Sequence, residues 1–184
     1  HADLEEAKDD VLMGVARRST MANIPPEELR LTAYHEGGHA LLAHFTRGAD
    51  PLHKATIVPR GQSLGSTWQL PVGDSYSISK QQLIARIAVA VGGRAAEDLV
   101  FGPDSITTGA SSDFRSATRI AQAMVQQYGF GEDGKLSFYE KDPRSAKEAD
   151  RIAEEVEAVL QEQYRYARDL LERERAALNR LANA

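Results

Sequence analysis

Two histidines four residues apart, with a glutamate directly after the first, are the clearest chemical signal in this chain. The run His35-Glu36-Gly37-Gly38-His39 matches the pattern H-E-x-x-H. On a helix, residues i and i+4 lie about 40° apart around the axis and about 6 Å apart along it, so both imidazoles can reach one ion. Glu36 lies about 100° from His35, where its carboxylate can hydrogen-bond a metal-bound water instead of competing for the metal. Two imidazoles without a thiolate favour zinc.

The competing interpretation of this run is an ordinary surface helix that carries two histidines and a glutamate. The pair Gly37-Gly38 costs a helix about 2 kcal/mol relative to alanine, so we expect another part of the chain to approach closely there. The neighbouring positions Leu31, Ala33 and Ala40 are apolar, so the surroundings of the motif are not simply solvated. Both features favour the metal site.

A catalytic zinc ion needs a third protein ligand and an open fourth position. Position 45, six residues after the second histidine, is a phenylalanine, so the three-histidine metzincin pattern is not met. His44 lies about 140° around the helix from the second histidine, and His53 falls in the following loop, where a structural role is favoured. Better candidates are Glu97, on a largely apolar helix, and Asp113, at the start of another helix. Spacing does not choose between these acids, and an N-terminal cap is the alternative role of Asp113.

The overall composition is that of an ordinary globular chain and excludes several classes of protein. The 184 residues are 42% hydrophobic and 27% charged, with a net charge of −5, so we expect no nucleic-acid partner. The sequence has no cysteine, which excludes disulfide frameworks, thiolate zinc fingers and cysteine nucleophiles. The longest apolar run, residues 87–91, is far shorter than the roughly 18–20 residues of a membrane span.

A second run, from Gly129 to Lys135, matches the first seven positions of a phosphate-binding P-loop. The eighth position must be serine or threonine to hold magnesium, and here it is Leu136. The run also follows a predicted helix instead of a strand, and two acidic residues stand where phosphates would bind. We therefore interpret it as a loop without a nucleotide-binding function.

Hydrophobic spacing predicts a mainly α fold with a small β-sheet or hairpin. Helices are expected over residues 4–18, 26–45, 79–91, 94–100, 113–128 and 145–181, the last as one long helix or two. The glycine pair at 92–93 separates two of these helices, and Ser79 is the expected N-cap of the first of them. Strands are expected over 55–59 and 66–70, with a turn at 60–62, and Pro59 indicates an edge strand.

Six runs of residues occur in a characteristic order along the chain. They are His35 to Ala40, Lys54 to Gly61, Leu64-Gly65, Gln69 to Pro71, Gly92 to Glu97 and Thr107 to Phe114. Together they resemble the peptidase domain of the FtsH family of membrane-bound AAA proteases, peptidase family M41. The resemblance begins in the first helix and extends to about Gly131, whereas the C-terminal helix matches only in character.

The resemblance implies a role for each candidate site residue. It makes His35, His39 and Asp113 the ligands of one zinc ion per chain, and it makes Glu36 the general base. Glu97 matches a glutamate once considered as a ligand, and the resemblance implies that it supports the ligands or the local structure. The chain is then a zinc metalloendopeptidase domain, with one domain expected over 1–184: a catalytic part (1–128), a loop (129–144) and a C-terminal helical segment (145–184).

The resemblance also implies properties of a larger protein. Family members form hexameric rings, and they carry a membrane segment and an ATPase module that uses ATP to unfold substrates, both expected outside this chain. The implied substrates are unfolded polypeptides and membrane proteins degraded for quality control. Gly37 and Ser112 replace the alanine and asparagine usual in bacterial relatives, so the closest members are mitochondrial inner-membrane proteins that face the intermembrane space. The bacterial inner membrane, with the domain in the cytoplasm, and the chloroplast are the alternative locations.

An unfolded substrate must be held with little sequence preference, which main-chain pairing with an exposed strand achieves. The segment 65–70 is short and β-capable, so Gly65, Ser66, Thr67 and Trp68 are candidate substrate-binding residues beside the zinc site. The alternative is an inner strand with both edges covered. For the whole chain, the alternative function is a non-catalytic helical domain for hexamerisation or interaction, with a structural metal or none. The intact Glu36 argues against that alternative, because such a domain does not need an acid there.

Overall fold

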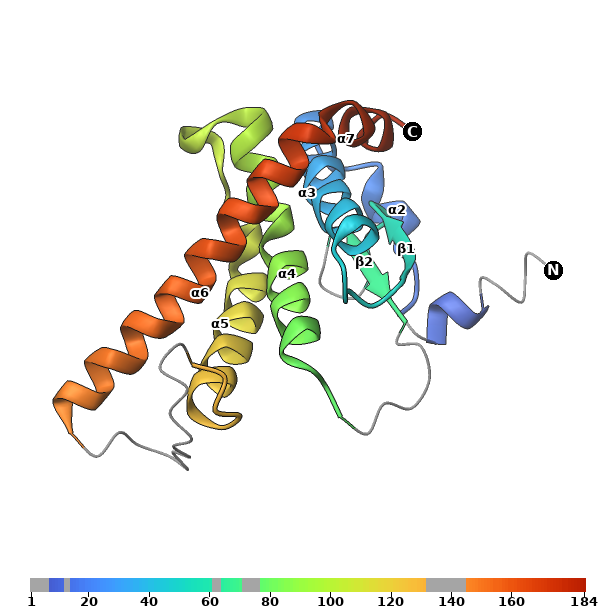
Figure 1. The fold of residues 1–184 in the computed structure, drawn as a ribbon. Helices are drawn as coiled ribbons and strands as arrows, with labels where there is room; N and C mark the ends of the chain where they lie inside the picture. The colour runs from blue at the N-terminus through green and yellow to red at the C-terminus, as the bar shows by residue number, and fades with distance from the viewer. Residues whose placement is uncertain (1–6, 12–13, 61–63, 71–76, 132–144) are drawn as a thin grey trace.

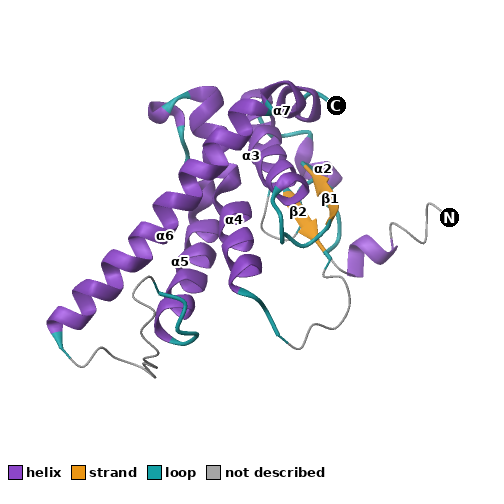
Figure 2. Cartoon of the chain, in the orientation of Figure 1, coloured by secondary structure: helices purple, strands orange, loops and turns teal. Residues whose placement is uncertain are grey.

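The computed structural model of the chain describes residues 7–11, 14–60, 64–70, 77–131 and 145–184. Its helices are α2 (Arg18–Met21), α3 (Pro26–Phe45), α4 (Lys80–Phe101), α5 (Ser111–Gln126), α6 (Ala146–Arg173) and α7 (Arg175–Ala182). The 3-10 turns η1 (Pro103–Ser105) and η2 (Thr108–Ala110) precede α5, and the strands are β1 (Leu52–Thr56) and β2 (Ser66–Gln69). Helices dominate and the sheet is small (Figure 1, Figure 2), which confirms the predicted fold class.

Helix α4 lies at the centre of the helical part. It packs against α3, α5 and α6, and the long α6 also contacts α5 (Figure 1). Helix α7 packs across α3. The largest fully buried apolar side chains come from all five of these helices: Leu42, Ile87, Met124, Leu171 and Leu178. Burial of these side chains is the main force that fixes the helices relative to one another.

The glycine pair at 92–93 does not interrupt the helix, so the predicted break is wrong. Helix α4 is continuous, and Ser79 is its N-cap, as predicted. The side chain of Gln82 completes a capping box with Ser79. A Cβ atom added at Gly38 would lie only 2.3 Å from the carbonyl oxygen of Gly92. The backbones of α3 and α4 therefore approach closely at this point, which is why glycine is needed on both helices.

The N-terminal segment is not the single helix predicted over 4–18. Residues 7–11 are helical, but Gly14 has a φ of 84°, a conformation that does not continue a helix. The N–H of Arg17 then donates to the carbonyl of Pro59 at 2.8 Å. A long-range contact with the segment after β1 thus outweighs the local helical preference of these residues. The chain becomes helical again at α2.

Strands β1 and β2 form an antiparallel pair in which Ala55 lies opposite Thr67. Strand β1 begins and ends earlier in the sequence than predicted. It ends because the Thr56 hydroxyl accepts a hydrogen bond from the N–H of Val58 at 3.1 Å, a local turn that redirects the chain. Within the described residues, β2 pairs with β1 alone. The pair packs against α3 (Figure 2).

The C-terminal segment forms two helices, α6 and α7, so the two-helix form of that prediction is correct. Some predictions fall outside the described residues: parts of the N-terminal helix (4–6 and 12–13), part of the turn at 60–62, and most of the loop that contains Leu136. In the described part of the chain, no helix combines the length and apolar character needed to cross a membrane.

Candidate metal centre

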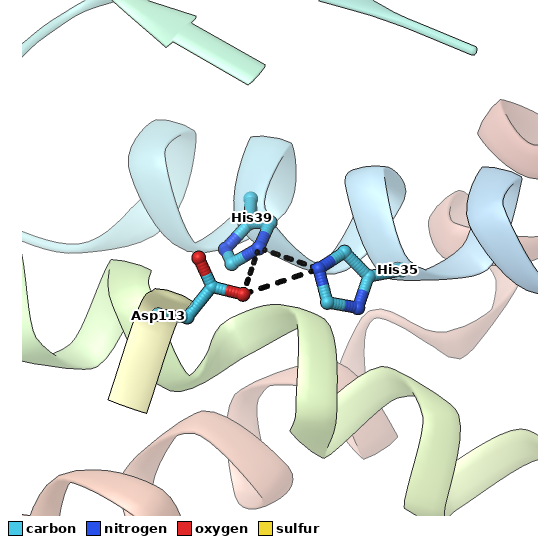
Figure 3. A group of neighbouring side chains, drawn as sticks. All are labelled: His35, His39 and Asp113. Atoms are coloured by element: carbon cyan, nitrogen blue, oxygen red, sulfur yellow. Dashed lines mark hydrogen bonds and ion pairs between the residues drawn. The ribbon is translucent and has the colours of Figure 1, made fainter. Parts of the chain in front are cut away.

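Three side chains from two helices converge beside α4 (Figure 3). His35 and His39 lie one turn apart on α3, and Asp113 lies in the first turn of α5. The Nε2 atoms of the two histidines are 3.1 Å apart. The Oδ2 atom of Asp113 lies 3.3 Å from Nε2 of His35 and 3.6 Å from Nε2 of His39. The structure thus brings together the three residues that the sequence and the resemblance nominate as ligands, in an arrangement that could hold a metal ion.

The other nitrogen of each imidazole faces an oxygen atom. Nδ1 of His35 lies 2.7 Å from Oε1 of Glu97, and Nδ1 of His39 lies 2.7 Å from the carbonyl oxygen of Val89. An ionised carboxylate and a carbonyl can only accept, so each Nδ1 donates its hydrogen. In a neutral histidine Nε2 then keeps a lone pair, and here both lone pairs point toward one another and toward a carboxylate. Three hydrogen-bond acceptors that face one another require a positive charge between them. Two imidazole nitrogens and one carboxylate oxygen are suitable ligands for a metal ion, which would supply that charge.

The spacing of the three atoms suits a tetrahedral zinc ion. Zinc binds histidine nitrogen and carboxylate oxygen at about 2.0–2.2 Å, which in a tetrahedron separates the ligand atoms by about 3.3–3.6 Å. The observed separations of 3.1, 3.3 and 3.6 Å lie close to that range. The group is also partly shielded from solvent, since the side chains of His35 and Asp113 are 13% and 24% exposed.

The pKa values show how strongly these groups interact. Burial disfavours the charged form of His35, but hydrogen bonds to Asp113 and Glu97 outweigh it and raise the pKa of His35 to about 9. Burial also raises the pKa of Asp113, but the interactions with His35 and His39 outweigh it and hold the pKa of Asp113 well below its usual value. A proton on His35 can therefore supply the positive charge that the acceptors require, and a metal ion would replace that proton.

Glu97 lies behind His35 and outside the group of convergent atoms. It is fully buried on α4, and its Oε2 accepts a hydrogen bond from the N–H of Thr107 at 3.0 Å. Arg94 lies nearby, with Nε 3.7 Å from the same oxygen. Burial raises the pKa of Glu97, but the bonds from His35 and Thr107 outweigh it and lower that pKa. Glu97 thus contacts the rear nitrogen of His35 and ties α4 to the loop that leads into α5.

The remaining candidates occupy other positions. Asp113 is not the N-cap of its helix: that position is Ala110, which makes no side-chain cap bond, so the capping alternative is wrong. Its carboxylate instead faces the histidines, because α5 packs beside α4. His44 is exposed on α3, and His53 lies 3.8 Å from Asp9. Neither of these two histidines joins the convergent group in the described structure.

A cleft of about 1720 Å³ opens onto the convergent group. Its lining includes the three convergent residues, Glu36 and residues 64–69. Glu36 is buried, and the hydroxyl of Thr67 donates a hydrogen bond to its Oε2 at 2.7 Å. The predicted general base and the predicted substrate strand, with Gly65, Ser66 and Trp68, therefore lie along the same cleft.

Comparison with known proteins assigns the chain to a family. Peptidase family M41 matches residues 22–184. This chain belongs to peptidase family M41. Among curated relatives, the Rickettsia felis protein "ATP-dependent zinc metalloprotease FtsH" is 46% identical over 99% of this chain and 30% of its own length. The Arabidopsis thaliana protein "ATP-dependent zinc metalloprotease FTSH 11, chloroplastic/mitochondrial" is 48% identical over 98% of this chain and 22% of its own length. The Caenorhabditis elegans protein "ATP-dependent zinc metalloprotease YME1 homolog" is 46% identical over 100% of this chain and 27% of its own length.

This M41 chain therefore spans between 22% and 30% of the length of those relatives. The six sequence runs that suggested the FtsH family indicated it correctly.

Gly93 lies at the candidate site of this M41 chain but is not among the site residues predicted from the sequence. A Cβ atom added there would lie 2.5 Å from Nε2 of His35 and 2.6 Å from Nε2 of His39, closer than real atoms approach. The available signal was a glycine inside an otherwise apolar helical pattern, which indicates a close approach as well as a break. The contact between Thr67 and Glu36 had no such signal, because it depends on how β2 packs against α3.

Proposed function

We propose that this chain is the zinc-dependent endopeptidase domain of an ATP-dependent AAA protease and that residues 1–184 form one domain. The observation that carries the proposal is the convergence of three acceptor atoms, from His35, His39 and Asp113, beside the buried carboxylate of Glu36. The chemistry of these donors fits zinc, with one ion per chain. The names of the relatives support the same assignment.

In the proposed mechanism the zinc ion and the side chains around it have different roles. When bound, zinc supplies Lewis acidity, which polarises the scissile carbonyl and lowers the pKa of water. Asp113 and the two histidines hold the ion, and Glu97 keeps His35 oriented through Nδ1. Glu36 takes the proton from the attacking water and gives it to the leaving nitrogen, as general base and then general acid.

Substrate is held along β2 in this proposal. Within the described residues β2 has a single partner strand, and its residues line the cleft together with the metal-binding group. An extended polypeptide that pairs with the other edge of β2 would be held through its main chain, independent of its side chains. Gly65, Ser66, Thr67 and Trp68 are the residues of this substrate strand.

Replacing Thr67 with proline should raise KM for an unfolded protein or abolish cleavage, because proline removes a main-chain donor from β2. Zinc content and helical content should stay at the wild-type level, because no metal ligand and no helix is altered. Steady-state kinetics, metal analysis and circular dichroism measure these three quantities. An unchanged KM for the Thr67→Pro variant would remove β2 from the substrate-binding site.

Replacing Gly93 with alanine should weaken zinc binding by at least about tenfold, because the new methyl group would displace both imidazoles. Helical content should not fall, since alanine favours a helix over glycine by about 1 kcal/mol. Chelator competition gives the zinc affinity. Gly37→Ala on α3 is the matched control, because its new Cβ would meet the side-chain ends of Leu178, at 3.1 Å, and Leu181, at 3.8 Å, and neither imidazole, so its zinc affinity should be unchanged. Equal zinc affinity of the Gly93→Ala variant and the wild type would show that the ion does not sit beside Gly93.

The larger setting is proposed from the relatives. ATP acts through an ATPase module outside this chain, the protein assembles as a hexamer, and its substrates are unfolded polypeptides and membrane proteins. The proposed location is the mitochondrial inner membrane, facing the intermembrane space, and the relative named as chloroplastic/mitochondrial supports a mitochondrial setting. The bacterial inner membrane and the chloroplast are the alternatives, since relatives of similar identity include bacterial and chloroplastic/mitochondrial proteins.

Hydrolysis of casein by the purified, zinc-loaded hexamer tests the proposed function. We expect cleavage that depends on Glu36. A hexamer that binds zinc but leaves casein intact in the presence of ATP would favour the non-catalytic alternative, in which these residues hold a structural metal.

A further inference from the structure

The carboxylate of Glu36 is held by β2 as well as by its own helix. The Glu36 residue is 8% exposed, and its Oε2 accepts a hydrogen bond from the hydroxyl of Thr67 at 2.7 Å. The same hydroxyl oxygen lies 3.2 Å from the main-chain carbonyl oxygen of Glu36. One threonine side chain therefore contacts both the carboxylate and the backbone of the general base.

A second contact with the same strand closes the space around Glu36. Gly65, just before β2, has no side chain, and a Cβ atom added there would lie 2.8 Å from Cγ of Glu36 and 2.9 Å from its Oε1. That atom would also lie 2.7 Å from Cγ2 of Thr32. The backbone of the strand thus packs directly on the Glu36 side chain, which leaves the carboxylate little room for another rotamer.

A hydrogen bond from a neutral hydroxyl to an ionised carboxylate is shorter and stronger than a bond between neutral groups. The bond from Thr67 also fixes where the Glu36 carboxylate lies, and a general base must lie within hydrogen-bond reach of the proton that it takes. A displacement of about 1 Å at a reacting group can cost about 10²-fold in rate. The Thr67 hydroxyl is the side-chain donor that fixes this carboxylate in the described structure.

We infer that Thr67 is a positioning residue for Glu36: its hydroxyl orients the general base, while the main chain of the same strand receives the substrate. The inference rests on the proposed function and deepens it. Residue 67 thus contributes its main chain to β2 and its side chain to the contact with Glu36. The main chain and the side chain of this residue therefore have separable roles, one expressed in KM and the other in kcat.

The test compares Thr67→Val, Thr67→Ser and the wild type in the zinc-loaded full-length protein. Valine keeps the branched shape and the main-chain N–H but removes the hydroxyl, so kcat should fall by at least about tenfold with KM and zinc content unchanged. Serine keeps the hydroxyl and should restore kcat to within about threefold of the wild type. A crystal structure of the zinc-loaded Thr67→Val variant should show the Glu36 carboxylate displaced and the zinc ligands unmoved.

Thr56→Val on β1 is the matched control. In the described structure the hydrogen-bond partner of its hydroxyl is the nearby N–H of Val58, and this variant should keep kcat within about twofold of the wild type. Wild-type kcat in Thr67→Val, or equal losses in Thr67→Val and Thr67→Ser, would overturn the inference. Failure of the proposed function is a different result, an inactive zinc-loaded wild type, and in that case the position of Glu36 in the crystal structures of wild type and Thr67→Val still decides the inference.

Discussion

Replacing Glu36 with glutamine should lower peptide turnover by at least about 10²-fold while the zinc content stays at about one ion per chain. Glutamine has the size of glutamate and can still accept a hydrogen bond from Thr67, but it cannot take a proton at neutral pH. The loss should therefore fall on kcat, with little change in KM. Metal analysis and steady-state kinetics on the same preparation give both numbers.

Glu28→Gln is the matched control for that variant. Glu28 also lies on α3 and lines the cleft, but it is exposed and is not part of the convergent group. The same chemical change there should leave turnover within about twofold of the wild type. Full activity of the Glu36→Gln variant would refute the proposed mechanism, and loss of zinc would show that Glu36 is itself a ligand.

Replacement of His35, His39 or Asp113 with alanine should remove most of the bound zinc in each case. A site with three protein ligands has no redundancy, so the loss of any one of them leaves two. Cleavage should be lost together with the metal. Zinc content after gel filtration, and zinc affinity by competition with a chelator, measure the effect.

Glu97→Ala is the comparison that separates a ligand from its support. Glu97 contacts the rear nitrogen of His35, so its removal should weaken zinc binding by about 10- to 100-fold and less than the removal of Asp113 does. If Asp113→Ala retained zinc and Glu97→Ala lost it, the assignment of the third ligand would be wrong. Circular dichroism of both variants is needed, because Glu97 is fully buried and also bonds to Thr107.

The fold could be predicted from sequence where local pattern and tertiary packing agree. Helix α3 is the clearest example: Pro26-Glu27-Glu28 predict its first turn and Gly48 its end, and it begins at Pro26 and ends at Phe45. Helix α4 was predicted with a break because the helix propensity of Gly92 carries no information about Gly38, its partner on another helix. The N-terminal helix fails for a related reason, since Arg17 bonds to the distant Pro59.

The same distinction between local pattern and tertiary packing decides which site residues could be predicted from sequence. His35, Glu36 and His39 could be predicted together, because one helix determines how they lie relative to one another. The third ligand could not be chosen from spacing, because the distance from Asp113 to the histidines depends on how α5 packs beside α4. In the structure both acidic candidates contact His35, Glu97 at Nδ1 and Asp113 at Nε2.

Metal content and peptidase activity should be measured on one preparation before chelation, after chelation and after zinc is restored. We expect about one zinc ion per chain at the start, loss of cleavage when the ion is removed, and recovery of cleavage when zinc is returned. Cleavage that persists after the chain has lost its metal would show that this chain is not a zinc-dependent peptidase.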